Sequence, residues 1–256
     1  MASIKEILKD KLVVKIFDTR DEMGKAAGCA VAEKIKEIIS EKGGLNMIFA
    51  AAPSQNETLA TLVEAEGIDW GKVNAFHMDE YIGLSADAPQ GFGNFLKDRI
   101  FSKLAFKSVN YIYAKGESAE ETCERYTKLI KENPIDIVCL GIGENGHIAF
   151  NDPWVADFND SEIIKKVALD DVCRQQQVND GCFEKIDDVP KYALTLTVPT
   201  LFNADYLFCT VPAKTKSEAV YKTVNNDINE DLPATIMRNH NNAIMYCDAD
   251  SGEKLL

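Results

Sequence analysis

Short apolar runs alternate with longer stretches of helical periodicity along almost the whole chain. We predict β-strands at residues 12–17, 46–51, 73–77, 109–113, 135–140, 163–169, 193–198, 206–211 and 243–247. Asp18 or Thr19 can cap a long helix that ends near Gly43. Further helices are expected after Pro53 and at residues 93–104, 118–131, 216–224 and 232–238.

The order of these elements indicates an α/β fold. Strands separated by helices favour βαβ units and a mostly parallel sheet. Several strands are apolar throughout, such as the runs at 46–51 and 135–140, which is typical of a sheet with helices on both faces. The chain contains no clear linker, so we expect residues 1–256 to form a single domain of modified Rossmann type.

Composition excludes several classes of function. The net charge of −13 argues against nucleic acid or an anionic membrane as a main partner, although local cations can still bind an anionic small molecule. The seven cysteines form no CxxC pair, and several lie in apolar runs, so we expect reduced thiols rather than disulfides or a zinc site. No signal peptide or membrane-spanning run is found, which predicts a cytoplasmic protein.

Candidate chemistry gathers in the segments that follow predicted strands. In open α/β sheets, ligands bind beyond the carboxyl ends of the strands. The segments that follow four of the strands carry hydroxyls, carboxylates, an imidazole, glycines and lysines. These candidates are Ser54, Gln55, Asn56, Thr58, Asp79, Glu80, Gly143, Asn145, His147, Asp152 and Lys216.

Each of these features has a simpler structural explanation. Asp79 with Glu80, or the hydroxyls at 54–58, can cap a helix. His147 can be a core histidine, and Lys216 a surface lysine. The glycines at 141–146 match a GxGxxG pattern, but they lie mid-chain and a proline follows at 153, which argues against a nicotinamide cofactor.

Taken together, the segments resemble the glucosamine-6-phosphate deaminase (isomerase) family. The resemblance rests on FHMDEYIGL at 76–84 and GIGENGHIAFNDP at 141–153, with VPKYALT at 189–195 and AIMYCD at 243–248 in the same order. It implies an enzyme that turns an amino-sugar 6-phosphate into a ketose 6-phosphate and ammonia, without metal or other cofactor. It leaves the oligomeric state open, from monomer to homo-oligomer.

The same resemblance implies a role for each matching residue. Asp79 would be the base at C2, and His147 would open the sugar ring, oriented by Asn145 and by Asp152, which stands where many members have Glu. Lys216 would bind the phosphate. Ser54, Gln55, Asn56, Thr58, Glu80, Gly143 and Arg174 complete the predicted substrate-binding set.

Two departures from the family pattern concern the phosphate. Residues 54–58 (SQNET) replace a glycine-rich loop, and Glu57 brings a negative charge there. Asn179, rather than Arg174, falls at the position of the family's phosphate-binding arginine. The alternatives are a 6-phosphogluconolactonase with the same fold, or a catalytically silent sugar-phosphate sensor.

Overall fold

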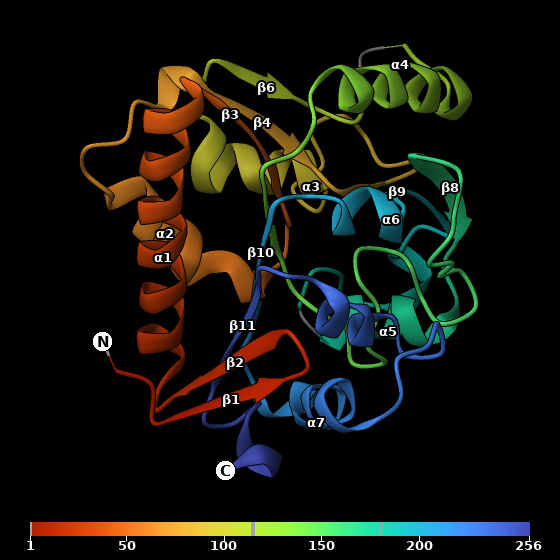
Figure 1. Cartoon of the computed structure of the whole chain (residues 1–256). Coiled ribbons are helices and arrows are strands. Elements are labelled where there is room, and N and C mark those ends of the chain that lie inside the picture. Colours follow the sequence, from red (N-terminus) through yellow and green to blue (C-terminus); the bar gives the residue numbers. More distant parts are fainter. Residues whose placement is uncertain (1, 114–115, 180) are drawn as a thin grey trace.

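A twisted, mostly parallel sheet forms the centre of the molecule (Figure 1). The computed structural model describes residues 2–113, 116–179 and 181–256. Within these ranges the main sheet has eight strands in the order β1-β2-β11-β10-β7-β3-β4-β6, and only β1 runs antiparallel to its neighbour. The strands are β1 (Lys5–Lys9), β2 (Leu12–Phe17), β3 (Leu45–Phe49), β4 (Val73–His77), β6 (Ser108–Asn110), β7 (Ile137–Leu140), β10 (Tyr206–Val211) and β11 (Ala243–Asp248).

Helices cover both faces of this sheet, as the apolar strands predict. The helices α1 (Arg20–Lys42), α2 (Asn56–Glu64) and α3 (Phe92–Leu96) contribute to one core, and α4 (Ala119–Glu132), α6 (Val198–Phe202) and α7 (Ser217–Asn225) contribute to the other. In Figure 1, α1 and α2 lie to the left of the sheet and α4, α6 and α7 to its right. The α/β class and the mostly parallel sheet are confirmed.

Side chains alternate between the two cores along each central strand. On β3, Met47 and Phe49 point into the core under α1 and α2, while Ile48 points into the core under α4 and α7. All three side chains are fully buried. The near-continuous apolar sequence of such a strand therefore follows directly from burial on both sides.

A second, smaller sheet lies beside the main one. Its three described strands, β5 (Asp79–Tyr81), β9 (Tyr192–Leu196) and β8 (Ile164–Ala168), are antiparallel. The sequence pattern predicted β8 and β9 as strands but not the sheet that they form, because alternation identifies a buried face and not the pairing partner. Asp79 of β5 stands directly opposite Thr195 of β9.

The helix ends follow local rules. The Thr19 side chain accepts a hydrogen bond from the Glu22 N–H, and α1 ends at Gly43 with φ of 79°, a conformation that glycine adopts without strain. Among the described strands and α-helices, four were not predicted: β1, β5, α6, and α5 (Asp171–Asn179). The predicted helix at 232–238 is a 3₁₀ helix, Pro233–Asn239.

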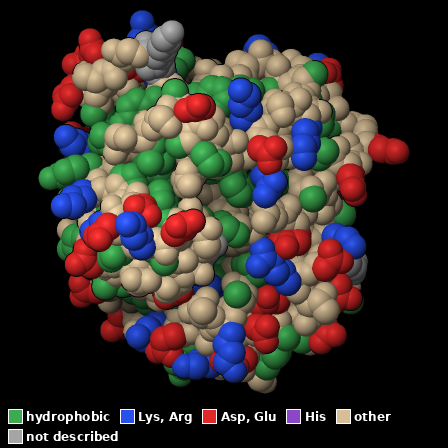
Figure 2. Space-filling view, turned by 180° about the vertical axis from the view of Figure 1, so that it is seen from behind, with side chains coloured by type: hydrophobic (Ala, Val, Ile, Leu, Met, Phe, Trp, Pro, Cys, Tyr) green, Lys and Arg blue, Asp and Glu red, His purple; other side chains and the backbone are tan. Residues whose placement is uncertain are grey.

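The surface and the cysteines fit the composition. Acidic and basic side chains are interspersed on the face shown in Figure 2. All seven cysteines are free, and four of them are buried. In the described ranges, no helix is both long and apolar enough to cross a membrane.

Candidate active site

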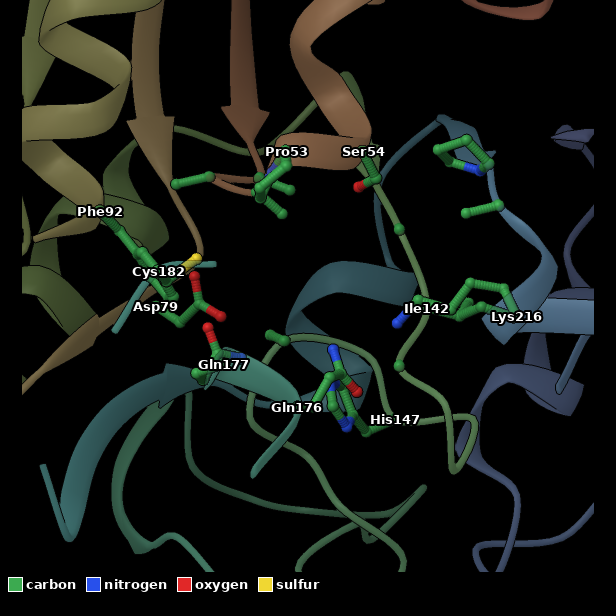
Figure 3. A pocket seen from close by; sticks show the side chains of 18 of the residues that line it. Pro53, Ser54, Asp79, Phe92, Ile142, His147, Gln176, Gln177, Cys182 and Lys216 are labelled. Atoms are coloured by element: carbon green, nitrogen blue, oxygen red, sulfur yellow. The ribbon is translucent and has the colours of Figure 1, made fainter. Parts of the chain in front are cut away.

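A cleft with a volume of about 130 Å³ opens where the carboxyl ends of the central strands meet. Asp79, His147, Ser54, Gly143 and Lys216 all line it, so the structure brings together one predicted residue or more from each of the four strand-end segments. Figure 3 shows Asp79 on one side of the cleft, His147 below it, and Ser54 and Lys216 on the side away from Asp79. The remaining lining comes from Arg20, Ala50, Ala51, Ala52, Pro53, Met78, Phe92, Gly141, Ile142, Ala149, Phe150, Gln176, Gln177, Cys182, Pro212, Ala213 and Thr215.

Asp79 is a buried carboxylate at the edge of the cleft, with 7% of the residue exposed. Its carboxylate accepts no hydrogen bond from the described residues, although Gln177 points toward it in Figure 3. Burial, together with the nearby charge of Glu80, raises the pKa of Asp79 well above its ordinary value. A carboxylate in this state is a stronger base than one in water.

The His77 imidazole supports the backbone of Asp79 through a hydrogen bond. Its Nδ1 lies 3.0 Å from the Asp79 carbonyl oxygen, and its Nε2 accepts a hydrogen bond of 2.9 Å from the Ile112 N–H. The accepting Nε2 fixes the neutral tautomer with the proton on Nδ1. Burial lowers the pKa of His77 to about 4, so this histidine is a structural support and remains neutral near pH 7.

His147 belongs to a closed hydrogen-bonded group. Its Nδ1 lies 3.0 Å from Oδ1 of Asp152, which also accepts a hydrogen bond of 2.8 Å from the Asn145 side chain. The side-chain oxygen Oδ1 of Asn145 in turn accepts from the His147 backbone N–H at 3.1 Å. Asn145 thus ties the backbone of His147 to the carboxylate that orients its ring, and Nε2 is left to act in the cleft.

The glycine at 143 makes room for that ring. A Cβ atom at Gly143 would lie 2.2–2.4 Å from three atoms of the His147 imidazole. The Gly143 N–H also donates to the His147 carbonyl oxygen at 2.9 Å. Gly143 therefore supports the imidazole through its backbone and through the absence of a side chain.

Asp152 is fully buried under this group. Burial alone would raise its pKa, but hydrogen bonds from His147, Asn145 and the Cys173 thiol lower it below the ordinary value. The ligand atoms of His147, Asp152 and Cys173 lie within 4.8 Å of one another, a set that could also hold a soft metal ion. Burial and the neighbouring carboxylates raise the pKa of Cys173, which keeps its thiol protonated as a hydrogen-bond donor to Asp152.

The small sheet connects Asp79 to the His147 loop. Thr195 pairs with Asp79 across the β5–β9 ladder, and its hydroxyl accepts a hydrogen bond of 3.1 Å from the Phe150 N–H. The Asn151 side chain donates to the Leu196 carbonyl at 2.9 Å. A single strand, β9, therefore fixes the separation between the two groups that face the cleft.

The opposite side of the cleft is built from two turns. Ser54 lies in the 3₁₀ turn Pro53–Gln55 that leads into α2, and the Gln55 amide donates to its hydroxyl at 3.1 Å. Lys216 ends the turn Lys214–Lys216 that leads into α7, and only 7% of the residue is exposed. Helix N-termini and a buried ammonium are suited to an anion.

Ala213, the residue before the second turn, has a strained backbone. Its φ of 82° and ψ of 146° lie in a region that residues with a side chain rarely adopt. The Asp248 carboxylate holds the conformation by accepting from the Ala213 N–H at 2.9 and 3.2 Å.

Five of the predicted substrate-binding side chains lie outside the residues that line the cleft. Gln55 is buried, and its side-chain amide donates to the Leu140 carbonyl at 3.2 Å. Asn56 accepts from Arg99, and Thr58 is buried against the Gly24 carbonyl. The Glu80 carboxylate accepts from the N–H groups of Phe92 and Gly93. Arg174 donates to the carbonyls of Ile186 and Val189 and to Asp171, so it anchors α5 to the segment that follows.

Glu57 does not face the cleft. Its Oε1 accepts a hydrogen bond of 2.8 Å from Nε of Arg20, at the start of α1. Arg20 lines the cleft, and its Nη2 donates to the Pro53 carbonyl at 2.5 Å. The negative charge of Glu57, which would repel a phosphate if it faced the cleft, is thus paired with the Arg20 cation at the rim of the cleft.

Sequence reasoning missed several of the lining residues. Arg20 lies three residues after the end of the predicted strand 12–17, so the rule used for the other strand ends could have found it. Gln176 and Gln177 lie on α5, which shows little apolar periodicity. The Gln176 side chain accepts from the Glu144 N–H at 3.0 Å and so connects α5 to the glycine loop.

Comparison with known proteins shows which family the chain belongs to. The family model described as glucosamine-6-phosphate isomerases/6-phosphogluconolactonase matches residues 18–246. The chain belongs to this family. The glucosamine-6-phosphate deaminase of Listeria innocua is 32% identical over 231 residues, which cover 90% of this chain and 97% of that protein. The Streptococcus gordonii deaminase is 30% identical over 93% of this chain and 97% of its own length.

Solved structures of the family share the fold. A monomeric glucosamine-6-phosphate deaminase superposes with a TM-score of 0.83 at 28% identity, covering 94% of this chain and 98% of that one. The 6-phosphogluconolactonase from Thermotoga maritima gives a TM-score of 0.75 at 18% identity, covering 93% of this chain and all of that one, and shows the fold alone. The chain is therefore an enzyme of the glucosamine-6-phosphate isomerase/6-phosphogluconolactonase family, and its sequence relatives carry the name deaminase.

Proposed function

We propose that this enzyme converts glucosamine 6-phosphate, or a closely related amino-sugar 6-phosphate, into a ketose 6-phosphate and ammonia. The observation that carries the proposal is a pair of groups that line the cleft: a buried carboxylate, Asp79, and an imidazole, His147, held by Asp152. Isomerisation of an aldose needs acid–base groups at the ring oxygen and at carbon 2. The names of the sequence relatives support the same reaction.

His147 would open the sugar ring. Its Nε2 takes the proton from the hydroxyl on C1, the C1–O5 bond breaks, and the same nitrogen returns a proton to O5. The open chain then carries an aldehyde at C1. Because Asp152 accepts the Nδ1 proton, it stabilises the imidazolium that exists between these two steps.

Asp79 would transfer the proton between carbons. Its carboxylate removes the proton from C2 while O1 takes a proton from the substrate's own ammonium group, which gives an enolamine with a hydroxyl on C1. The protonated Asp79 then returns its proton to C1, which gives an iminium at C2. Water adds to C2, and ammonia leaves as the ketone forms. Since burial raises the pKa of Asp79, the fraction of ionised base, and with it the rate, should increase as the pH rises through that raised value.

The phosphate would lie at the side of the cleft away from Asp79. Ser54 offers a hydroxyl at the start of the α2 segment, and Lys216 offers an ammonium. Both follow strands whose ends are fixed in the parallel sheet, so the distance from phosphate to reacting carbons is set by the fold.

A panel of substrates tests this function. We expect ammonia and ketose 6-phosphate from at least one amino-sugar 6-phosphate, and no hydrolysis of 6-phosphogluconolactone. Lactone hydrolysis without ammonia would support the lactonase alternative, and binding without turnover would support a sensor.

Asp79→Asn tests the role of the base. The amide keeps the shape but cannot accept the C2 proton, so exchange of the C2 hydrogen with deuterated solvent should fall by roughly 10²–10⁴-fold. Asp87→Asn, at an exposed position outside the lining of the cleft, is the control and should exchange normally. Normal exchange in Asp79→Asn would exclude this assignment.

A further inference from the structure

We propose that Arg20, positioned by Glu57, is a second cationic anchor for the anionic group of the substrate. This inference rests on the proposed function and specifies how the same site recognises the anionic group of its substrate. Arg20 and Lys216 are the cationic side chains among the described residues that line the cleft. Arg20 comes from α1 and Lys216 from the turn before α7, so the two charges are supplied by separate parts of the chain.

The hydrogen bonds of Arg20 determine which edge of its guanidinium is available. Nε donates to Glu57, and Nη2 donates to the Pro53 carbonyl. These two bonds occupy one edge of the planar group. Nη1 makes no hydrogen bond to another described residue, so the edge formed by Nη1 and Nη2 can bind two oxygens of a phosphate at once.

The pairing with Glu57 depends on a close approach of two helices. A Cβ atom at Gly24 of α1 would lie 2.2 Å from Cβ of Glu57 on α2, so only glycine at 24 lets the two helices meet here. The contact turns the Glu57 carboxylate toward Arg20, one helical turn before Gly24. Glu57 Oε2 is buried without a hydrogen-bond partner in the described part of the chain, so this carboxylate has Arg20 as its charged partner.

The Arg20 guanidinium lies near the other groups of the cleft that can bind an anion. Arg20 binds the carbonyl of Pro53, the residue before Ser54, whose hydroxyl lines the cleft. Ser54 lies on the side of the cleft that also holds Lys216. A hydroxyl, an ammonium and a guanidinium edge together suit a phosphate dianion better than a neutral sugar hydroxyl.

The test compares phosphorylated and unphosphorylated sugars on matched variants of the full chain. Loss of a charge-assisted hydrogen bond weakens binding by roughly ten- to hundredfold. We therefore expect Arg20→Gln to raise KM for glucosamine 6-phosphate, and the inhibition constant for inorganic phosphate, by about that factor. Its activity on high concentrations of unphosphorylated glucosamine should change less than about twofold. Arg20→Lys keeps the positive charge but loses the planar guanidinium that can bind two oxygens at once, so it should recover part of the loss.

Arg99 provides the control. This half-exposed arginine also contacts α2, through Asn56, but does not line the cleft, so Arg99→Gln should bind both sugars normally. Equal losses for phosphorylated and unphosphorylated sugar in Arg20→Gln would mean that Arg20 only supports the fold. An unchanged KM and phosphate inhibition constant would also overturn the inference.

Failure of this inference can be told apart from failure of the proposed function. If the wild-type enzyme releases no ammonia from any amino-sugar phosphate, the function is wrong. Inorganic phosphate binding, measured by calorimetry on wild type, Arg20→Gln and Arg99→Gln, still decides whether Arg20 holds an anion. A tenfold or greater loss confined to Arg20→Gln supports the anchor, and equal affinities refute it.

Discussion

Replacement of Asp152 by Asn tests whether the His147–Asp152 pair serves ring opening. The substitution keeps the size of a fully buried side chain and leaves an oxygen that can accept from Nδ1 of His147. It removes the negative charge that would stabilise the imidazolium. A hydrogen bond to a charged group contributes about 1.5–3 kcal/mol and a neutral one about 0.5–1.5, so about 1–1.5 kcal/mol should be lost.

That loss corresponds to a roughly tenfold lower kcat/KM for the cyclic substrate. His147→Gln, which removes the acid–base group itself, should cost more, roughly 10²–10⁴-fold. The informative comparison is a 5-deoxy analogue of the amino-sugar phosphate, which lacks the C5 hydroxyl and cannot close the pyranose. Asp152→Asn should slow the cyclic substrate and leave ammonia release from the analogue nearly unchanged.

Two results would refute this reasoning. Equal losses on cyclic and 5-deoxy substrates would place His147 in proton transfer at carbon instead of ring opening. No loss on either would mean that the buried carboxylate only fills space beneath the ring. Circular dichroism and thermal melting of the variant show whether its fold is intact.

Three further predictions follow from the supporting residues. Lys216→Ala should weaken binding of a 6-phosphate sugar by roughly ten- to hundredfold and barely affect the unphosphorylated sugar in steady-state assays; equal effects on both would exclude a phosphate contact. His77 has a folded pKa of about 4 against an ordinary 6.5, so the unfolded chain binds its proton first and stability falls as the pH drops from 6.5 toward 4. Between pH 7.5 and pH 5, chemical denaturation should show the wild type losing about 2 kcal/mol more than His77→Gln; parallel losses would contradict a buried neutral imidazole. Ala213→Gly should relieve the strained φ and raise Tm by about 2–4 °C, the effect of ~1 kcal/mol in a chain of this size, whereas a lower Tm would show that the strain is smaller than the entropy cost of glycine.

Much of the fold follows from local sequence pattern. The strands β2, β4 and β10 were placed where they lie, and Thr19 is one of the two residues proposed as the cap of α1, because continuous burial and capping chemistry are both visible in the residues themselves. The order of the strands in the sheet could not be predicted in this way, since pairing depends on contacts between distant segments.

The cleft was predictable in part for the same reason. Asp79, His147, Ser54 and Lys216 follow strands, and parallel strands bring their carboxyl ends to one edge. The residues that α5 brings to the cleft were not predictable. Helix α5 buries Arg174, Gln176 and Gln177, so its inner face is polar and carries no hydrophobic periodicity.

The pairing of Glu57 with Arg20 shows a further limit. A carboxylate next to an expected phosphate looks unfavourable when only its own segment is considered. Its partner lies 37 positions earlier and reaches it through a helix contact at Gly24. Electrostatic interactions of this kind become visible only when the helices are packed together.

The space at Gly143 offers a criterion for sorting related chains. Any side chain at this position would occupy the place of the His147 ring, so the imidazole could not keep this pose. A relative that retains the acid and the histidine but carries alanine or serine at the equivalent position must have its imidazole elsewhere. Such a chain can still bind a sugar phosphate, yet it should be assayed as a binding protein before it is called an enzyme.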